Sequence, residues 1–385
     1  MGKKRILVLT DHMPWGHRAI AKAIHGYLKP VEAKYGWQVD YDEVELQFKA
    51  ANELYVFIYR FWPSIGKVNL KMMENETLRK AFVEVLDSDL PNLIEKIEGY
   101  EPDLVISTYF MHSHALAKWR KEHRQKFKLW NVVADPWTIN PVSFVPGADI
   151  NLVYDEAGEE LALKLGIEKN KVFKSGWWVR KEMYRPELND PAFRFKIRKK
   201  LGFDDKQPVI FVGGGSLGTN SIAKLFPALL LIKRDVGVVF NSGTDKMTYA
   251  MVERFSQLLE RLKLTKRVKI VNLGWIENMG EILCACDVVF GKAGPNFLFD
   301  VVAVGKPFVA ITHVGGQEDG NLELIKRKKL GWVREKLAQP VDFLLKYSRS
   351  PKKYNDKYRI TISEEAKRNQ KTESNIVELV KKVME

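Results

Sequence analysis

The stretch PVIFVGGGSLGTNS, residues 208–221, places a β-branched and aromatic run directly before a cluster of glycines. The residues that follow, IAKLFPALLLI at 222–232, are predominantly apolar and predict a helix. Adjacent glycines let backbone amides approach a phosphate closely, and a helix N-terminus favours negative charge. We therefore predict a strand, a turn that binds a diphosphate, and a helix. The alternative is a turn that only joins the strand to the helix.

The glycine spacing of this turn argues against a nicotinamide enzyme. Gly213, Gly214, Gly215 and Gly218 do not form the G-x-G-x-x-G pattern, and no acidic residue closes a second strand nearby. The turn therefore favours a phosphate-bearing ligand other than a dinucleotide.

Two more polar turns that contain glycine also follow predicted strands. They are GKAGPN, residues 291–296, and HVGGQEDGN, residues 313–321. The carboxyl ends of parallel strands share one edge of a sheet, and open α/β sheets bind their ligands at that edge. The three turns together predict a binding site there, although each turn alone is ordinary.

Apolar runs that are typical of buried parallel strands alternate with helical patterns along the whole chain. The predicted strands are residues 5–10, 37–44, 102–108, 128–135, 150–155, 208–214, 236–242, 268–274, 286–291 and 307–311. Between the two sets, the polar and proline-bearing residues 176–191 predict a linker. The pattern predicts an α/β protein with two Rossmann-like domains that face each other across a cleft, residues 1–180 and 181–364.

Composition excludes several classes of protein. With 385 residues, 45% of them hydrophobic and 29% charged, the chain is neither disordered nor collagen-like. Only two cysteines, Cys284 and Cys286, are present, which fits a cytoplasmic location. The apolar run after the basic start is too short for a signal peptide, and no run reaches the ~20 apolar residues of a membrane span. The formal net charge of +14 favours anionic partners, but no nucleic-acid-binding motif accompanies it.

Several segments resemble the diacylglycerol glycosyltransferases, the monogalactosyldiacylglycerol synthases and processive diacylglycerol glucosyltransferases of the glycosyltransferase family 28 type. GKAGPNFLFDVVAVGKPFVAITHVGGQEDGN, residues 291–321, resembles their donor-nucleotide segment. NVVADPWTINPVSFVPGADINLVYDEAGEELALKLGI, residues 131–167, is similar to their TDxxxxHPxW segment, and KVFKSGWWVRKEMYRP, residues 171–186, to their GxPVRxxF segment. The resemblance spans residues 6–332 and implies the GT-B fold. It also implies that a C-terminal helix, residues 365–385, packs back on the first domain.

The resemblance further implies which residues bind a UDP-sugar. It assigns Gly214, Gly215 and Ser216 to the diphosphate, Lys292, Ala293, Gly294, Pro295 and Asn296 to the phosphate-sugar side, Gln317 and Glu318 to the sugar hydroxyls, Asp300 to the ribose, and Trp275 and Ile276 to the uracil ring. Asp300 stands where the family has a glutamate that is longer by one methylene. For Trp275, packing in the core is the alternative, because large aromatic side chains are usually buried.

The loop DHMPWGHRAIAKAI, residues 11–24, resembles the family loop GGGH-[RK]-[AS] and places His17 at the position of the candidate base. A histidine can accept a hydroxyl proton near neutral pH. From spacing alone, a surface histidine near a helix start is the simpler interpretation. Met13, Pro14 and Trp15 replace glycines of the family loop, which predicts a reshaped acceptor pocket.

The segment ELYVFIYRFWPSIGKVNLKMM, residues 53–73, combines aromatic and basic side chains. Such side chains suit the interface between lipid tails and anionic head groups, so Tyr59, Arg60 and Trp62 are predicted to face the acceptor and the membrane. In the family this region abuts the membrane. The alternative is a buried helix of the first domain.

Two polar side chains that follow strands of the first domain, His112 and Asp135, are further candidates for the acceptor side. For Asp135 the alternative is a helix or turn cap. The pair of His112 with His114, like the pair of cysteines, lacks further ligands at metal-binding spacing, so no metal site is predicted.

These observations predict an inverting hexosyltransferase that moves sugar from a UDP-hexose to a lipid hydroxyl, most simply that of diacylglycerol. UDP-sugar is then a substrate and no cofactor is expected. The expected location is peripheral, on the anionic inner face of the cell membrane. The alternatives are a nucleotide-sugar-binding protein without transfer activity, a UDP-sugar epimerase, and a GT-B transferase with another acceptor.

Overall fold

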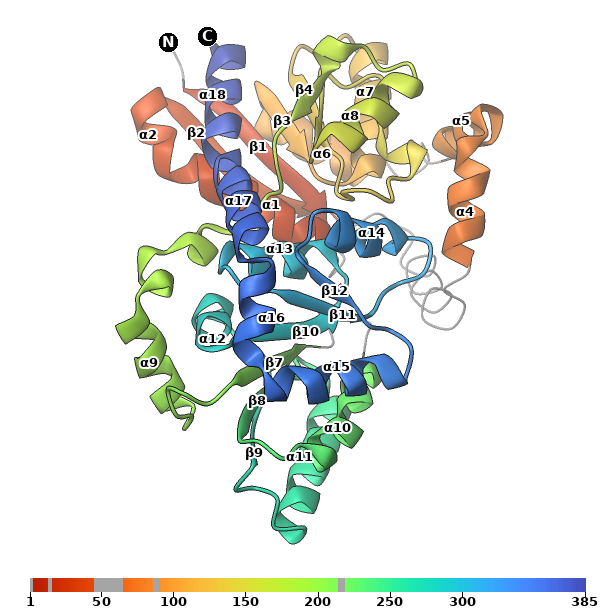
Figure 1. The fold of residues 1–385 in the computed structure, drawn as a ribbon. Coiled ribbons are helices and arrows are strands. Elements are labelled where there is room, and N and C mark those ends of the chain that lie inside the picture. The colour runs from red at the N-terminus through yellow and green to blue at the C-terminus, as the bar shows by residue number, and fades with distance from the viewer. Residues whose placement is uncertain (1–2, 13–15, 45–64, 86–90, 214–218) are drawn as a thin grey trace. The chain divides into compact units, whose positions relative to one another are not determined.

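The computed structural model describes residues 3–12, 16–44, 65–85, 91–213 and 219–385 (Figure 1). The chain divides into two compact units. Unit 1 comprises Met1–Lys181, Gly315–Gly320 and Arg368–Glu385, and unit 2 comprises Glu182–Val314 and Asn321–Lys367. Each unit contains one six-stranded sheet.

The sheet of unit 1 has the strand order β2-β1-β3-β4-β5-β6, and every neighbouring pair is parallel. Its strands are β1 (Lys4–Asp11), β2 (Trp37–Val44), β3 (Leu104–Ser107), β4 (Lys128–Val132), β5 (Ile150–Val153) and β6 (Val172–Lys174). In β1, Ile6 pairs with Val39 on one side and Leu104 on the other. Residues 6–9 are all buried, as expected for a strand covered on both faces.

Helices connect the strands of unit 1 and cover its sheet. They are α1 (Gly16–Leu28), α2 (Glu32–Tyr35), α4 (Ile65–Glu74), α5 (Glu76–Val85), α6 (Pro91–Tyr100), α7 (Phe110–Glu122), α8 (Glu156–Lys164) and α18 (Thr372–Met384), with short 3₁₀ turns at Lys29–Val31, Pro141–Ser143 and Lys169–Lys171. In α1 the buried residues Ile20, Ile24 and Tyr27 recur at helical spacing and form its inner face. The C-terminal α18 packs against α1 (Figure 1).

The sheet of unit 2 has the order β12-β11-β10-β7-β8-β9 and is also parallel. If these six strands are numbered 1 to 6 along the chain and the sheet is read from β9, the order is 3-2-1-4-5-6. This is the strand order of a Rossmann sheet. Its strands are β7 (Val209–Gly213), β8 (Val236–Asn241), β9 (Val268–Leu273), β10 (Val288–Lys292), β11 (Phe308–Thr312) and β12 (Gly331–Val333). Its helices are α9 (Pro191–Lys200), α10 (Phe226–Leu231), α11 (Lys246–Arg261), α12 (Met279–Ala285), α13 (Pro295–Ala303), α14 (Asp319–Arg327), α15 (Ala338–Arg349) and α16 (Pro351–Lys357), with 3₁₀ turns at Lys181–Tyr184, Pro186–Asn189 and Thr219–Leu225. Helix α17 (Arg359–Gln370) spans the division between the units.

All ten predicted strands are present, with ends that shift by at most three residues. The three-residue strands β6 and β12 at the sheet edges were not predicted, because so short a run shows no periodicity. The α/β class is confirmed.

The segment 176–191 contains the division between the units after Lys181, and its first residues are packed in unit 1. Trp177, Trp178 and Val179 are almost fully buried. The Trp177 amide donates to Asn369 Oδ1 at 3.0 Å, and Thr372 Oγ1 donates to the Ser175 carbonyl at 2.8 Å, so the C-terminal segment of unit 1 secures this stretch.

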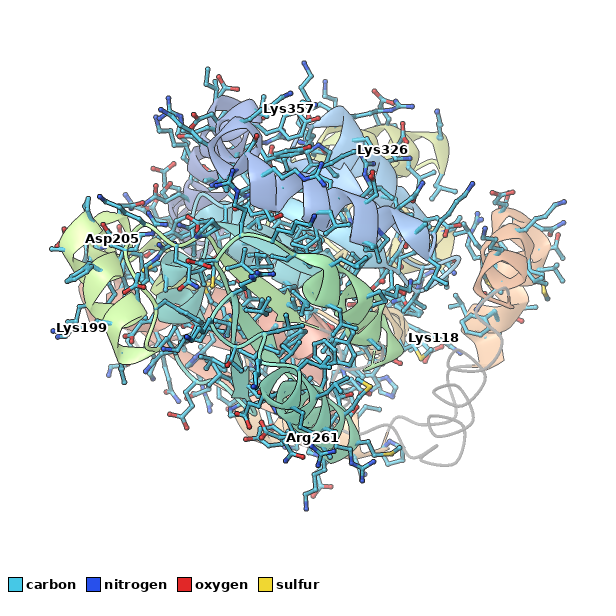
Figure 2. All side chains as sticks on the ribbon, turned by 60° about the horizontal axis from the view of Figure 1, so that its bottom comes forward. Lys118, Lys199, Asp205, Arg261, Lys326 and Lys357 are labelled. Atoms are coloured by element: carbon cyan, nitrogen blue, oxygen red, sulfur yellow. The ribbon has the colours of Figure 1, made fainter. Side chains whose placement is uncertain are left out.

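Long charged side chains surround both cores. Lys199, Arg261, Lys326 and Lys357 are exposed and extend away from the ribbon (Figure 2). Among the helices that the structure describes, none is both long enough and apolar enough to span a bilayer.

Candidate functional site

In unit 1 the chain changes direction across the sheet between β1 and β3. Strand β1 pairs with β2 on one side and β3 on the other, so the connections that leave β1 and β3 diverge at their carboxyl ends. Open α/β sheets bind ligands at such a switch point. Asp11 ends β1, His17 lies in the first turn of α1, and Thr108 and Tyr109 follow β3.

The His17 imidazole is fixed by the backbone beside it. Its Nδ1 lies 2.6 Å from the carbonyl oxygen of Thr108, and because a carbonyl only accepts, Nδ1 carries the proton. The Thr108 hydroxyl lies 2.9 Å from Thr10 Oγ1 and 3.1 Å from the His17 carbonyl, which ties β1, α1 and the end of β3 together. In the neutral ring, Nε2 therefore bears the lone pair.

Burial lowers the pKa of His17 below that of a free histidine, and the Thr108 carbonyl offsets part of this effect. The side chain is only half-buried, so it is not sealed in the core. A neutral imidazole with a defined basic nitrogen is the form that a general base requires near pH 7.

Two aromatic rings lie behind His17. Tyr109 makes an edge-to-face contact with His17 at 5.4 Å between ring centroids, and His112 makes one with Tyr109 at 5.1 Å. Burial also lowers the pKa of His112, to about 3, so this ring is neutral at physiological pH. His112 is fully buried on α7. Tyr109 was not singled out from the sequence, since only the loop geometry reveals its contact with His17.

Asp135 lies after β4 and is half-buried. Burial raises its pKa to about 7. A carboxyl group that titrates near neutral pH is typical of a functional site, although structural burial has the same effect.

Several predicted residues lie outside the described part of the chain. They are Gly214, Gly215 and Ser216 of the glycine turn, Tyr59, Arg60 and Trp62 of the acceptor segment, and Met13, Pro14 and Trp15 of the loop before His17.

The switch point of unit 2 lies between β7 and β10. Gly213 at the end of β7 pairs with Gly291 of β10, and on the other side of β10 the register with β11 shifts between Gly291 and Lys292. A Cβ on Gly291 would lie 2.8 Å from Phe297 Cε1 and 3.2 Å from the Gly213 carbonyl. Only glycine therefore lets the two strand ends and Phe297 pack this closely.

The turn that follows β10 is held on two sides. The Ala293 amide donates to the Thr312 carbonyl at 2.9 Å, and Asn321 Nδ2 donates to the Ala293 carbonyl at 2.8 Å. Gly294 then caps α13, and Pro295 occupies its first turn. The turn thus directs the N-terminus of α13 to the ligand-binding edge of the sheet. The role of Asn321 was not predicted, although it ends the third polar turn.

The remaining predicted donor residues differ in exposure. Trp275 is 74% exposed, which rules out the alternative that it packs in the core, while Ile276 is half-buried. Lys292 and Asn296 are half-buried. Gln317 and Glu318 belong to the Gly315–Gly320 segment that clusters with unit 1, and Glu318 is buried.

Asp300, the predicted ribose ligand, is only 7% exposed on α13. The pKa of Tyr184 is raised first by burial and then by the negative charge of Asp300. Asp300 therefore lies near a half-buried tyrosine of its own unit.

A polar pair that was not predicted lies at the carboxyl ends of β11 and β12. His313 Nδ1 lies 2.6 Å from Glu335 Oε1. Lys224 Nζ donates to the Ile311 carbonyl at 2.7 Å and the Glu335 carbonyl at 3.1 Å. These contacts connect the carboxyl ends of β11 and β12, beside the turn that follows β10.

Unit 2 has the N-terminus of α13 at its switch point, and unit 1 has an oriented, half-buried histidine at its own. Two Rossmann-type units of this kind are typical of the GT-B class of glycosyltransferases. The Anabaena HepE structure in complex with UDP and glucose has the same fold, with a TM-score of 0.55, 16% identity, and coverage of 98% of this chain and 99% of that one.

Within that class, residues 17–179 match the family model for monogalactosyldiacylglycerol (MGDG) synthase, and residues 209–339 match the glycosyltransferase family 28 C-terminal domain. The chain thus matches an MGDG-synthase model followed by a glycosyltransferase family 28 C-terminal domain, which confirms the resemblance seen in its motifs.

Individual relatives of low sequence identity carry names that agree with these family models. A probable chloroplastic MGDG synthase of Glycine max is 22% identical over 367 residues, which cover 91% of this chain and 63% of the relative. A processive diacylglycerol beta-glucosyltransferase of Bacillus pumilus is 22% identical over 322 residues, which cover 83% of this chain and 80% of the relative. The chain thus spans less than two thirds of the length of the plant relative.

Proposed function

We propose that this protein transfers a hexose from a UDP-hexose to the hydroxyl of a lipid, with diacylglycerol as the acceptor and with inversion at the anomeric carbon. The observation that carries the proposal is the half-buried His17, whose Nδ1 is committed to the Thr108 carbonyl and whose Nε2 is left as the basic nitrogen. The names of the relatives support a UDP-hexose donor class and a lipid acceptor.

The reaction is a single displacement. His17 Nε2 takes the proton of the acceptor hydroxyl as its oxygen bonds to the anomeric carbon of the sugar. The bond from that carbon to the diphosphate oxygen breaks, and UDP leaves with the bonding electron pair. Backbone amides at the switch point of unit 2 and the N-terminus of α13 stabilise the charge that grows on the leaving diphosphate.

A lipid acceptor requires contact with a bilayer, and the α4–α5 pair suits this role. Val68, Met72 and Leu78 are exposed apolar side chains there, at 56%, 47% and 44% exposure. Lys67 and Lys71 are exposed on the same α4. Apolar side chains flanked by cations favour the surface of an anionic membrane, so we place the protein peripherally on its inner face.

The decisive variant is His17→Ala. The matched control is His123→Ala, because His123 is an exposed histidine at the end of α7. We expect kcat to fall by about 10²- to 10⁴-fold in His17→Ala, because general base catalysis contributes rate enhancements of that size. The affinity for UDP should remain unchanged, and the control should behave as the unmodified protein. An equal loss of UDP affinity and of rate would contradict the role of His17 as the base.

The same assay separates the other functions. Purified protein is incubated with UDP-glucose or UDP-galactose, with and without vesicles that contain diacylglycerol, and products are identified by mass spectrometry. A glycolipid that forms only with vesicles supports the proposal. UDP-sugar binding without product would indicate a binding protein, and a new UDP-sugar without vesicles would indicate an epimerase.

A further inference from the structure

Three rings at the switch point of unit 1 are joined by two successive contacts, from His17 to Tyr109 and from Tyr109 to His112. The proposed transfer reaction uses only His17. The planes of His17 and Tyr109 meet at 72°, and those of Tyr109 and His112 at 85°. Both contacts are therefore edge-to-face, the arrangement that aromatic rings prefer. The row runs from the half-buried His17 to the fully buried His112.

The inner two rings are fixed by the fold. Tyr109 lies between β3 and α7, where its hydroxyl lies 3.1 Å from Met111 Sδ, and His112 lies in the first turn of α7. Since Thr108 supplies the carbonyl that binds His17 Nδ1, the same short turn holds the imidazole through a hydrogen bond and through the ring contact with Tyr109.

The charged groups around His17 do not replace this support. Asp11 ends β1 and lies close enough to raise the pKa of Tyr109, after the larger effect of burial. Glu43 of β2 is engaged by Arg18 at 2.9 Å. His112 stays uncharged, so the rings behind His17 carry no positive charge that would oppose its protonation.

We propose that Tyr109 and His112 are positioning residues for His17, acting as a column of rings in edge-to-face contact that holds the imidazole in the orientation in which Nδ1 meets the Thr108 carbonyl. The inference rests on the proposed role of His17 as the base. The hydrogen bond alone fixes one atom of the ring, and rotation of the imidazole would carry Nδ1 away from the Thr108 carbonyl, so that the proton would no longer be held on Nδ1. The edge-to-face contact with Tyr109 opposes that rotation and so keeps Nε2 as the basic nitrogen.

The test compares variants that keep or remove a ring. Tyr109→Leu and His112→Ala remove one, whereas Tyr109→Phe and His112→Phe keep a ring at the same position. The tautomer and the pKa of His17 are read from its imidazole ¹⁵N and ¹H signals, which need no substrate. The pH profile of kcat is measured in parallel with diacylglycerol vesicles and the UDP-hexose that is turned over.

We expect the two ring-removing variants to give a mixture of His17 tautomers, a shift in the pKa of His17, and a kcat about tenfold lower with KM for the UDP-hexose unchanged. The two phenylalanine variants should restore the single tautomer and most of kcat. Should Tyr109→Leu fail to fold, His112→Ala tests the same column from its inner end. An unchanged His17 tautomer in a folded ring-removing variant would overturn the inference.

The result is separable from the fate of the proposed function. If His17→Ala retained full transferase activity while Tyr109→Leu still altered the His17 tautomer, the column would exist but His17 would not be the base. If His17→Ala lost activity while both ring-removing variants kept the tautomer and the pH profile, His17 would be the base without this support.

Discussion

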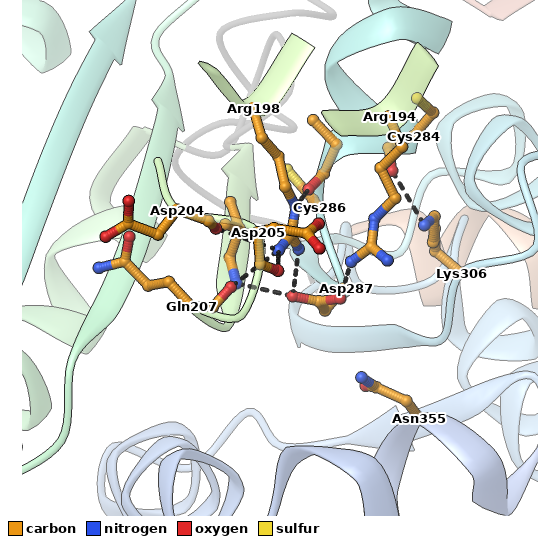
Figure 3. A network of polar contacts seen from close by, with 12 residues as sticks. Arg194, Arg198, Asp204, Asp205, Gln207, Cys284, Cys286, Asp287, Lys306 and Asn355 are labelled. Atoms are coloured by element: carbon orange, nitrogen blue, oxygen red, sulfur yellow. Dashed lines mark hydrogen bonds and ion pairs between the residues drawn. The ribbon is translucent and has the colours of Figure 1, made fainter. Parts of the chain in front are cut away.

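A group of buried rings in unit 1 and a network of buried charged groups in unit 2 lie at opposite ends of their sheets. In unit 1 the buried rings lie at the carboxyl ends of β1 and β3. In unit 2 a network of charged groups lies at the amino ends of β7 and β10, where Asp287 directly precedes β10 and accepts from the Val209 amide at 2.7 Å (Figure 3).

In the network of unit 2, each guanidinium nitrogen of Arg198 has a hydrogen-bond partner. Arg198 is only 1% exposed, and its Nε donates to the Ala285 carbonyl at 2.8 Å. Its Nη1 donates to the Gln207 carbonyl at 2.9 Å, and its Nη2 to Asp287 Oδ2 at 2.7 Å. Arg194 donates to the other oxygen of Asp287 (Figure 3). A buried charge with this many partners fastens α9 to the sheet.

The buried His112 of unit 1 lacks such partners. It interacts weakly with the Val44 backbone, and neither of its ring nitrogens makes a hydrogen bond of normal geometry with the described residues. A buried polar group without a partner costs about 1 to 3 kcal/mol of stability. The amino end of the unit 2 sheet is therefore organised for stability, whereas the carboxyl end in unit 1 gives up stability where the candidate base lies.

The largest expected effect comes from breaking the network. Asp287→Ala would leave Arg198 buried without its carboxylate, which typically costs about 3 to 5 kcal/mol. The measurement is unfolding in urea combined with hydrogen exchange of β7 and β1, because a chain of two units need not unfold in one step. Protection should fall in β7 and persist in β1.

The matched control for this variant is Asp342→Ala. Asp342 pairs with Lys346 at 2.7 Å on the surface of α15, and the two side chains are 61% and 60% exposed. Exposed pairs contribute only ~0.2 to 1 kcal/mol. Equal losses in the two variants would show that the network is no more important for stability than a surface ion pair.

The sequence was sufficient to predict the sheets but not this network. Strands such as β1 and β7 are continuous apolar runs, and their pattern depends only on local residues. Arg198 and Asp287 are 89 residues apart. Nothing in the pattern around either residue indicates that they meet, because a buried ion pair depends on tertiary packing.

The second largest expected effect is on the pH dependence of stability, to which the buried His112 contributes. The folded protein binds a proton at His112 only near pH 3, because burial lowers the pKa to about 3, whereas the unfolded chain binds one below its usual pKa of 6.5. Between these values the unfolded state takes up the extra proton, so stability is present above pH 6.5 and falls as the pH decreases. From pH 7 to pH 5 this loss amounts to about 2 kcal/mol.

His112→Phe should remove that loss, because phenylalanine does not titrate. The measurement is the free energy of unfolding of unit 1 at pH 7 and pH 5, in His112→Phe and in the unmodified protein. His17 titrates in both proteins, so the difference between them isolates His112. Parallel decreases in the two proteins would mean that His112 is not kept neutral by the fold.

The residues of the candidate site could be predicted where they belong to one sequence motif. They could not be predicted where the contact joins loops that are far apart in the sequence. His17 follows from a loop resemblance, but the Thr108 carbonyl, 91 residues away, and the neighbouring Tyr109 were not predicted. Every residue has a backbone carbonyl, so the residue type does not indicate which carbonyl will accept a hydrogen bond. Only the folded geometry shows it. Asn321 was missed for a related reason, since its partner is the Ala293 backbone.

The smallest expected effect tests whether the charged groups of unit 1 behave like those of unit 2. Arg18 and Glu43 pair at 2.9 Å beside His17, with 31% and 15% of their side chains exposed. Because water reaches this pair, Arg18→Met should lower the free energy of unfolding by less than about 1 kcal/mol, and added salt should diminish the difference. Urea unfolding at low and high salt measures it, with Lys80→Met, which removes an exposed partner of Glu76, as the reference. A loss as large and as insensitive to salt as that of Asp287→Ala would show that the carboxyl end of the unit 1 sheet is also secured by buried charge, and the contrast between the two units would not hold.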